Sequence, residues 1–187
     1  MAENLNIGVI IAESIGSASN NLIIEKFCFE DNPFNCDGYG GLYNWDEMMQ
    51  YNDLEATQGI CPSGWHLPTD NEWKTLEGTV DSQFGIGDAE WNGILFRGFD
   101  AGLNLKTTNN WNGTNLFGFN ALPAGGFDPT FGGWSGMGVS AAFWTSTGLT
   151  AGAMYRGLDE SVSSVSRFNF PKTSLMSVRC VKNGPVN

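Results

Sequence analysis

The run CPSGWHLPTDNEWKTL, residues 61–76, carries the most specific structural signal in the chain. Thr69 and Glu72 have the spacing of a capping box, in which each side chain accepts a hydrogen bond from the other residue's backbone amide. Asp70 adds negative charge to the first turn, where the helix dipole favours it. The run therefore predicts a helix from Asp70 to about Glu77, with Gly78 as its C-cap glycine.

Short apolar stretches on both sides of this helix predict the other elements. Leu42, Trp45, Met48 and Met49 recur at helical spacing, which indicates a second helix over about residues 42–51. Residues between 81 and 138 are rich in glycine and asparagine and predict a long irregular segment. Strands are expected over residues 7–12, 22–29, 142–147, 153–158, 162–170 and 175–181. The pattern is that of an α+β protein with two helices, a small antiparallel sheet and long irregular loops.

Length and charge narrow the class of protein. The chain has 187 residues, of which 41% are hydrophobic, enough for one domain with an ample core. Its 9 basic and 20 acidic residues give a net charge of -11 at pH 7, which repels nucleic acid and anionic membranes. No apolar run is long enough to cross a bilayer. We expect neither nucleic-acid binding nor membrane insertion.

Four cysteines allow three pairings. We expect Cys28 to pair with Cys36, which bracket a short loop, and Cys61 to pair with Cys180, which would join the helical half to the last strand. Both bonds indicate an oxidising compartment. The alternative is four reduced thiols in a cytosolic protein. A zinc site is disfavoured, because the chain has no Cys-x2-Cys spacing and one histidine.

The run at residues 61–76 resembles the GWHvPTDaEW signature of the Fibrobacter succinogenes major paralogous domain, a family of secreted and surface proteins in Bacteroidetes-type bacteria. It is also similar to the LPTEaEWEyA segment of the formylglycine-generating-enzyme group. Further segments match in family order, namely MAENL (1–5), YGGLYNW (39–45), GFNALPAGG (118–126), FWTST (143–147) and SVRCV (177–181). The resemblance implies a C-type-lectin-like fold that forms a single domain over residues 1–187. It implies neither a reaction nor a ligand.

The resemblance also bears on the start of the chain. In the family, the segment matching residues 1–5 usually follows an opening strand or hairpin, which this sequence lacks. We therefore expect Met1 to be a processed or truncated end. One hypothesis is a mature subunit of a surface filament or larger assembly, in which neighbouring copies order the termini by β-augmentation. The alternative is a compact domain whose two ends pair with each other.

Catalysis is not expected. The formylglycine-generating enzymes use two closely spaced redox cysteines toward the C-terminus, and this chain has only Cys180 there. His66 is the sole histidine, and no G-x-S-x-G nucleophile motif is present. A histidine between Trp65 and Leu67 is more often a packed structural side chain than a general base.

Two loops offer candidate ligands for a metal ion. Oxygen ligands for a structural calcium occur at Asp31, Asn32, Asn35 and Asp37, and again at Asn109, Asn110, Asn112 and Asn115. Neither group has EF-hand spacing, and asparagine-rich loops usually satisfy their own backbone. We therefore expect no cofactor, and structural calcium is the alternative.

Aromatic side chains offer a second kind of ligand site. Trp91, Trp111 and Trp134, with Asn115 beside them, are candidate ligand-binding residues because they lie in polar loops and flat indoles stack on sugar rings. Burial beneath a loop is the competing interpretation, and core packing is expected for Trp45, Trp65, Trp73 and Trp144.

Together these patterns predict a non-enzymatic secreted or cell-surface protein that acts in adhesion or as a structural subunit of an extracellular filament. The alternative is a carbohydrate-binding module that uses the loop tryptophans. The third hypothesis is an oxidase related to the formylglycine-generating enzymes. Expected partners are copies of the same chain, or a surface glycan or protein.

Overall fold

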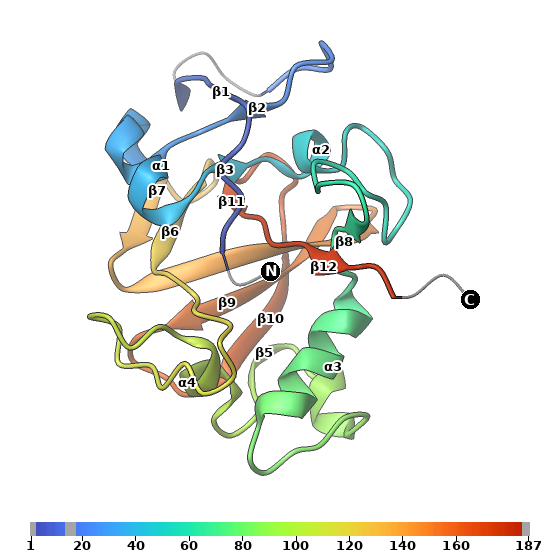
Figure 1. The fold of residues 1–187 in the computed structure, drawn as a ribbon, viewed down its shortest axis with the longest axis vertical. Helices are drawn as coiled ribbons and strands as arrows, with labels where there is room; N and C mark the ends of the chain where they lie inside the picture. The colour runs from blue at the N-terminus through green and yellow to red at the C-terminus, as the bar shows by residue number, and fades with distance from the viewer. Residues whose placement is uncertain (1–2, 14–17, 185–187) are drawn as a thin grey trace.

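The computed structural model describes residues 3–13 and 18–184 (Figure 1), so Met1, the expected processed end, lies outside the described residues. The centre of the fold is an eight-stranded sheet. Six of its strands follow the order β3-β11-β8-β9-β10-β5, and β6 pairs with both β8 and β7. β8 is parallel to β6 and to β11, and the other pairs are antiparallel. The strands are β3 (Leu42–Tyr43), β5 (Leu95–Arg97), β6 (Ala124–Asp128), β7 (Gly133–Met137), β8 (Ser140–Leu149), β9 (Gly152–Asp159), β10 (Val165–Phe170) and β11 (Met176–Ser177).

Two small strand pairs and several helices complete the α+β fold. β1 (Val9–Ile10) runs parallel to β2 (Glu25–Lys26) at the upper end of Figure 1, and β4 (Trp65–His66) pairs with β12 (Val181–Lys182). The α-helices are α1 (Pro33–Tyr39), α2 (Trp45–Met48), α3 (Asp70–Val80) and α4 (Ala101–Leu105). Short 3-10 helices span Phe29–Asp31 and Ala89–Asn92.

The start of α3 confirms the predicted capping box. The amide of Glu72 donates to Thr69 Oγ1 at 3.1 Å, and the amide of Thr69 donates to Glu72 Oε2 at 2.8 Å. The predicted end of this helix was wrong, because α3 continues to Val80 and its C-cap is Asp81. Gly78 lies inside the helix, where an added Cβ would be 2.7 Å from the backbone oxygen of Gly85. Glycine is needed there for close packing.

The second predicted helix is shorter than residues 42–51. Leu42 and Tyr43 pair with β11 as a strand, and the side chain of Asn44 caps α2 by accepting from the amide of Glu47 at 2.8 Å. The helix ends because Gln50 and Tyr51 are in the left-handed conformation, with φ of 52° and 55°. An N-cap and a left-handed turn therefore limit a periodic apolar pattern to one helical turn.

Residues 81–138 are more regular than expected, and the sheet is correspondingly larger. They contribute β5, α4, β6 and β7. Glycine in this region indicated turns, but Gly125 belongs to β6, with a φ of 64°. An added Cβ there would lie 2.6 Å from the Ser135 oxygen and the Met137 nitrogen of β7. This glycine permits close approach of two strands, which composition alone does not distinguish from a turn. Two further helices, α1 and α4, were also missed.

Both expected disulfides are confirmed. Cys28 and Cys36 are joined by a 2.02 Å bond, and so are Cys61 and Cys180. The second bond sits beside a further link between distant segments, since the amide of Leu5 donates to the carbonyl of Val178 at 2.9 Å. The Nε of Arg179 donates to Asn4 Oδ1 at 2.7 Å. Residues near the two ends of the chain are thus held together with the segment that precedes α3.

The two disulfides should differ in their effect on stability, because they close loops of different length. The cysteines are separated by 119 positions for Cys61–Cys180 and by 8 for Cys28–Cys36. The chain-entropy model predicts a loss of roughly 4 to 5 kcal/mol for Cys61→Ser/Cys180→Ser and about 2 to 3 kcal/mol for Cys28→Ser/Cys36→Ser. Denaturant unfolding of both double variants checks this order, and a larger loss for the short loop would contradict it.

Candidate functional site

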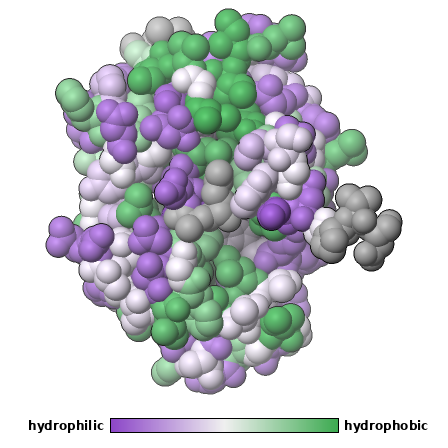
Figure 2. Space-filling model, viewed as in Figure 1, coloured by the Kyte–Doolittle hydropathy of each residue, from purple (hydrophilic) through white to green (hydrophobic). Residues whose placement is uncertain are grey.

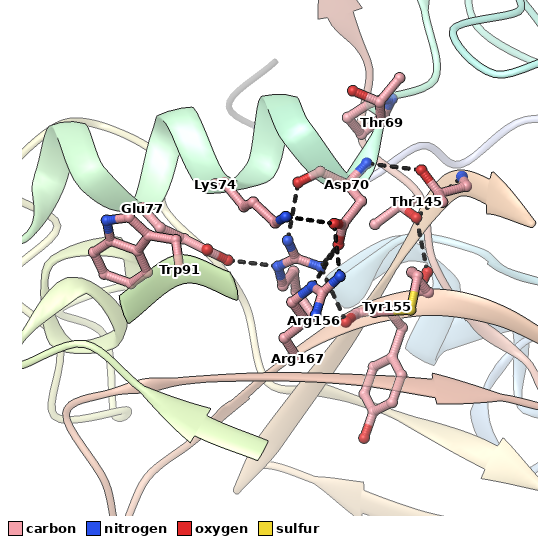
Figure 3. Close-up of polar contacts among 12 residues, drawn as sticks. Thr69, Asp70, Lys74, Glu77, Trp91, Thr145, Tyr155, Arg156 and Arg167 are labelled. Atoms are coloured by element: carbon pink, nitrogen blue, oxygen red, sulfur yellow. Dashed lines mark hydrogen bonds and ion pairs between the residues drawn. The ribbon is translucent and has the colours of Figure 1, made fainter. Parts of the chain in front are cut away.

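One face of the main sheet is closed by buried charges beneath α3. Arg156 on β9 donates from Nε to Glu77 Oε1 at 2.5 Å and from Nη1 to Asp70 Oδ1 at 2.8 Å, as Figure 3 shows. Arg97 on β5 pairs with the other Glu77 oxygen. Arg167 on β10 donates to both Asp70 oxygens, at 2.8 Å and 2.9 Å. We call these five side chains the α3 charge network.

The centre of the α3 charge network is shielded from solvent. The side chains of Glu77 and Arg156 are both 0% exposed. Burial lowers the pKa of Arg97 to about 10, against the opposing charge of Glu77, so this guanidinium stays charged at neutral pH. Lone buried charges are costly, but every carboxylate here has guanidinium partners. The arrangement fixes a helix to three strands.

The opposite face of the sheet is open. Successive strand residues point to opposite sides, so Tyr155 points away from the α3 charge network while Arg156 points toward it (Figure 3). The strand register places Ala142, Gly157, Ser166 and Phe96 in one row across four strands. Three small residues in that row leave a depression in the sheet, ending at an aromatic ring.

This depression, which we call the sheet trough, has a volume of about 230 Å³. Small residues form its floor, and an added Cβ on Gly157 would lie 2.3 Å from Ser166 Oγ. Aromatic rings and two carboxylates line it with serine hydroxyls between them. The lining includes Phe96, Phe127, Tyr155, Phe170, Asp128, Asp159, Ser135, Ser140 and Ser166.

The chemistry of the sheet trough favours a ligand with hydroxyl groups and apolar ring faces. Phe96 is 57% exposed, and the rings of Tyr155 and Phe170 meet edge to face with centroids 5.3 Å apart. Burial raises the pKa of Tyr155, so its hydroxyl stays protonated and neutral. Asp128 and Asp159 are the charged residues of the described lining. They can accept hydrogen bonds and would repel an anionic ligand.

The predicted ligand-binding residues do not gather in one place. Trp91 and Trp111 are each 1% exposed, and their indole N–H groups donate at 2.9 Å to the carbonyls of Gly85 and Val139. Their position matches the competing interpretation, burial beneath a loop. Asn115 supports a turn, since its Oδ1 accepts from the amide of Asn120 at 2.7 Å.

Trp134 is the one predicted residue near the sheet trough. It is half-buried on β7 and packs against Phe127 of the trough lining, with ring centroids 5.1 Å apart. Of the four tryptophans expected in the core, three are fully buried and Trp65 is half-buried. The tryptophan count pointed toward aromatic binding chemistry, but the aromatic rings that line the trough are phenylalanines and a tyrosine, of which Phe96 is exposed.

In the oxygen-rich loops considered for calcium, several of these side chains form hydrogen bonds with backbone groups. Asp31 Oδ1 accepts from the amide of Glu13 at 2.9 Å, and Asn32 caps α1 by accepting from the amide of Phe34. In the second loop, Asn112 donates from Nδ2 to the carbonyl of Glu160 at 2.6 Å. Residues 3–13 and 18–184 contain no group of three or more His, Cys, Asp or Glu side chains arranged to hold a metal ion.

His66 joins three segments. Its Nε2 lies 2.7 Å from Glu72 Oε1 and its Nδ1 lies 2.6 Å from Asn183 Oδ1. Burial by itself would lower the pKa of His66, but the bonds to Asn183 and Glu72 outweigh it and raise the pKa above its usual value. Both ring nitrogens are engaged, which suits a link between β4, α3 and the segment after β12.

The fold and the site define a class of disulfide-linked α+β proteins with a closed helical face and an open, aromatic-lined sheet face. The chain belongs to the Fibrobacter succinogenes major domain family, whose model matches residues 1–182. No curated protein and no solved structure matched the chain.

Sequence reasoning missed the sheet trough, because its residues come from seven strands, β5 to β11, and share no motif. One sequence signal of this face was present in YRGLD, residues 155–159. Its tyrosine, glycine and aspartate alternate with the other residues, so they fall on one side of a strand. The strand pairing that aligns Gly157 with Ser166 and Phe96 is visible only in the fold.

The α3 charge network predicts acid sensitivity. Burial favours protonation of Asp70, but Arg167 and Arg156 outweigh it and hold the pKa of Asp70 well below its usual range. Its stabilising effect is therefore full at neutral pH and is lost as the pH falls below about 4 toward the folded-state pKa. We expect Asp70→Asn to lower the free energy of unfolding at pH 7 by about 3 kcal/mol and to flatten its decline in acid.

Urea unfolding between pH 7 and pH 2 measures this effect. Asp46→Asn is the matched control, because Asp46 is 50% exposed and lies 3.9 Å from Lys172, outside the network. The control should keep the wild-type acid slope. Equal acid slopes for Asp70→Asn and the wild type would show that Asp70 does not titrate as described.

Proposed function

We propose that the protein is a non-enzymatic extracellular adhesion protein and that its sheet trough binds a neutral glycan. The observation that carries this proposal is the trough itself. It combines the exposed ring of Phe96 and the half-buried rings of Phe127, Tyr155 and Phe170 with a floor of small residues and hydroxyl or carboxylate groups on one open sheet face. Concave sites with apolar walls and a few polar groups are the usual form of ligand sites.

An extracellular location fits several observations. Two disulfides are typical of proteins that fold in an oxidising compartment. Membership of the Fibrobacter succinogenes major domain family is consistent with a surface or secreted protein. Among the described residues, no helix combines the length and apolar character required to cross a membrane.

The ligand class follows from charge and shape. Phe96 and Tyr155 offer ring surfaces on which a pyranose can stack, and the serine hydroxyls and carboxylates can bond its hydroxyls. An anionic glycan would meet Asp128 and Asp159 in the trough and a chain with a net charge of -11. Neutral sugars are therefore favoured over sialylated, sulfated or uronic-acid glycans.

The non-enzymatic part of the proposal rests on how the reactive groups are used. Cys180 is joined to Cys61, so it is not part of a catalytic cysteine pair in this state. His66 has structural partners at both ring nitrogens. Glu77 and Arg156 of the α3 charge network are fully buried and paired. These groups support structure, and none of them lines the sheet trough.

A C-type-lectin-like arrangement is part of the proposal. It is supported by the link between Leu5 and Val178, the Cys61–Cys180 bond, and the capped helix α3 against a sheet. The proposed ligand position lies on the open sheet face and not at the loop tryptophans that the sequence predicted.

A panel of neutral and anionic oligosaccharides tests the proposal. We expect the wild type to bind neutral members, and Phe96→Ala to bind about tenfold more weakly because an exposed stacking surface worth about 1.4 kcal/mol is lost. Ala142→Leu should also weaken binding, because it fills the floor of the trough. Titration calorimetry or a glycan array gives the dissociation constants.

Phe131→Ala is the matched control, since Phe131 is 84% exposed on the turn between β6 and β7 and does not line the sheet trough. It should bind as the wild type does. The proposal fails if no neutral glycan binds, or if Phe96→Ala and Ala142→Leu bind as strongly as the wild type while remaining folded.

A further inference from the structure

The upper end of the molecule carries an exposed apolar projection. Leu22 is 96% exposed, and Val9, Ile10 and Ile23 are 56%, 43% and 53% exposed. Figure 2 shows hydrophobic surface gathered at this end, where β1 and β2 lie in Figure 1. We call these four residues the apolar tip. Isolated apolar side chains are common on surfaces, but a contiguous group of this kind is typical of an interaction site.

The apolar tip is held in place by polar bonds behind it. Asn21 Oδ1 accepts from the amide of Ile23 at 2.9 Å, and Asn21 Nδ2 donates to Glu25 Oε1 at 3.1 Å. Leu22 has a φ of 67°, a conformation that is unfavourable for a leucine. The turn therefore exposes Leu22 fully in a strained backbone conformation. The acidic side chain of Glu25 lies next to the turn, bonded to Asn21.

A groove with matching properties lies beside α3. It has a volume of about 500 Å³, within the range of about 300–1,000 Å³ that is usual for ligand pockets. Trp65, Trp73, Leu76 and Phe119 form its apolar lining, and Lys182 is among its charged residues. Figure 2 shows hydrophobic surface in the hollow beside α3. We call this the α3 groove.

One residue that lines the α3 groove, Trp73, has a hydrogen-bond donor that is unpaired among the described residues. The indole N–H of Trp73 is buried and has no acceptor within the described part of the chain. Buried donors normally have a partner. A polypeptide occupant carries carbonyl acceptors as well as apolar side chains, which a purely hydrocarbon occupant does not.

We propose that the apolar tip of one molecule docks into the α3 groove of a second copy. The apolar side chains of the tip fit the aromatic lining, and Glu25 beside the tip complements Lys182 at the groove. Local complementarity is needed, because two chains with a net charge of -11 each repel one another overall. This proposal does not depend on glycan binding.

The geometry of the contact determines the type of assembly. The apolar tip and the α3 groove are different surfaces on separate elements, β1–β2 and α3 (Figure 1). Once one tip has docked into one groove, the resulting dimer therefore still offers one free tip and one free groove. Such a heterologous contact builds rings when the rotation closes and helical filaments when it does not.

Two variants separate the halves of this interface. Leu22→Asp places a charge on the tip, and Thr79→Arg blocks the groove from an exposed helix position that lines it. Leu54→Asp and Thr108→Arg are the matched controls, since Leu54 is 71% exposed and neither residue lies in the tip or the groove. Circular dichroism verifies that all four variants fold.

Sedimentation velocity over a wide concentration range provides the measurement, and electron microscopy shows the form of any polymer. The wild type and both controls should associate, with each interface variant at least a hundredfold weaker. A mixture of Leu22→Asp and Thr79→Arg should yield dimers only, because it retains one intact tip and one intact groove. The proposal is overturned if the wild type stays monomeric, if the controls also lose association, or if the mixture yields no dimers.

Discussion

The rest of the structure depends on the salt bridges that fix α3 to the main sheet. Glu77 and Asp70 come from one helix, whereas Arg97, Arg156 and Arg167 come from β5, β9 and β10. Separating these groups would leave charges in a dry interior, and breaking a buried pair is strongly destabilising. The helix position and the alignment of three strands are therefore set together.

This constraint has a consequence for the other side of the sheet. Because side chains alternate along a strand, Arg156 on the closed face places Tyr155 and Gly157 on the open face. The row from Ala142 to Phe96 then forms a depression that no helix covers among the described elements. The same three strands thus supply a rigid base on one side and, in our proposal, a glycan site on the other.

Assembly and glycan binding would reinforce each other. Single sugar sites of this size generally bind weakly, and a series of linked sites raises the effective affinity without any new contact. The sheet trough and the α3 groove lie on different faces, so a docked copy would leave the trough accessible. A polymer of weak binding sites is a suitable design for adhesion.

The sequence predicted the features that depend on neighbours along the chain. The capping box at Thr69 and Glu72 was recognisable because four consecutive positions specify it. Both disulfide pairs were also anticipated. Gly78 was misjudged, and Gly125 lay in a segment predicted to be irregular, since a glycine that allows close packing has the same sequence appearance as one that ends a helix or forms a turn. The convergence of Arg97, Arg156 and Arg167 depends on strand pairing and could not be predicted.

Hydrogen–deuterium exchange with a bound neutral oligosaccharide tests the central claim, that the open sheet face binds the ligand and the α3 face is structural. The account predicts slower exchange in β5, β6, β9 and β10, which line the sheet trough, with α3 unchanged. Protection centred on α3, or on the loop around Trp111, with no change in those strands would contradict it.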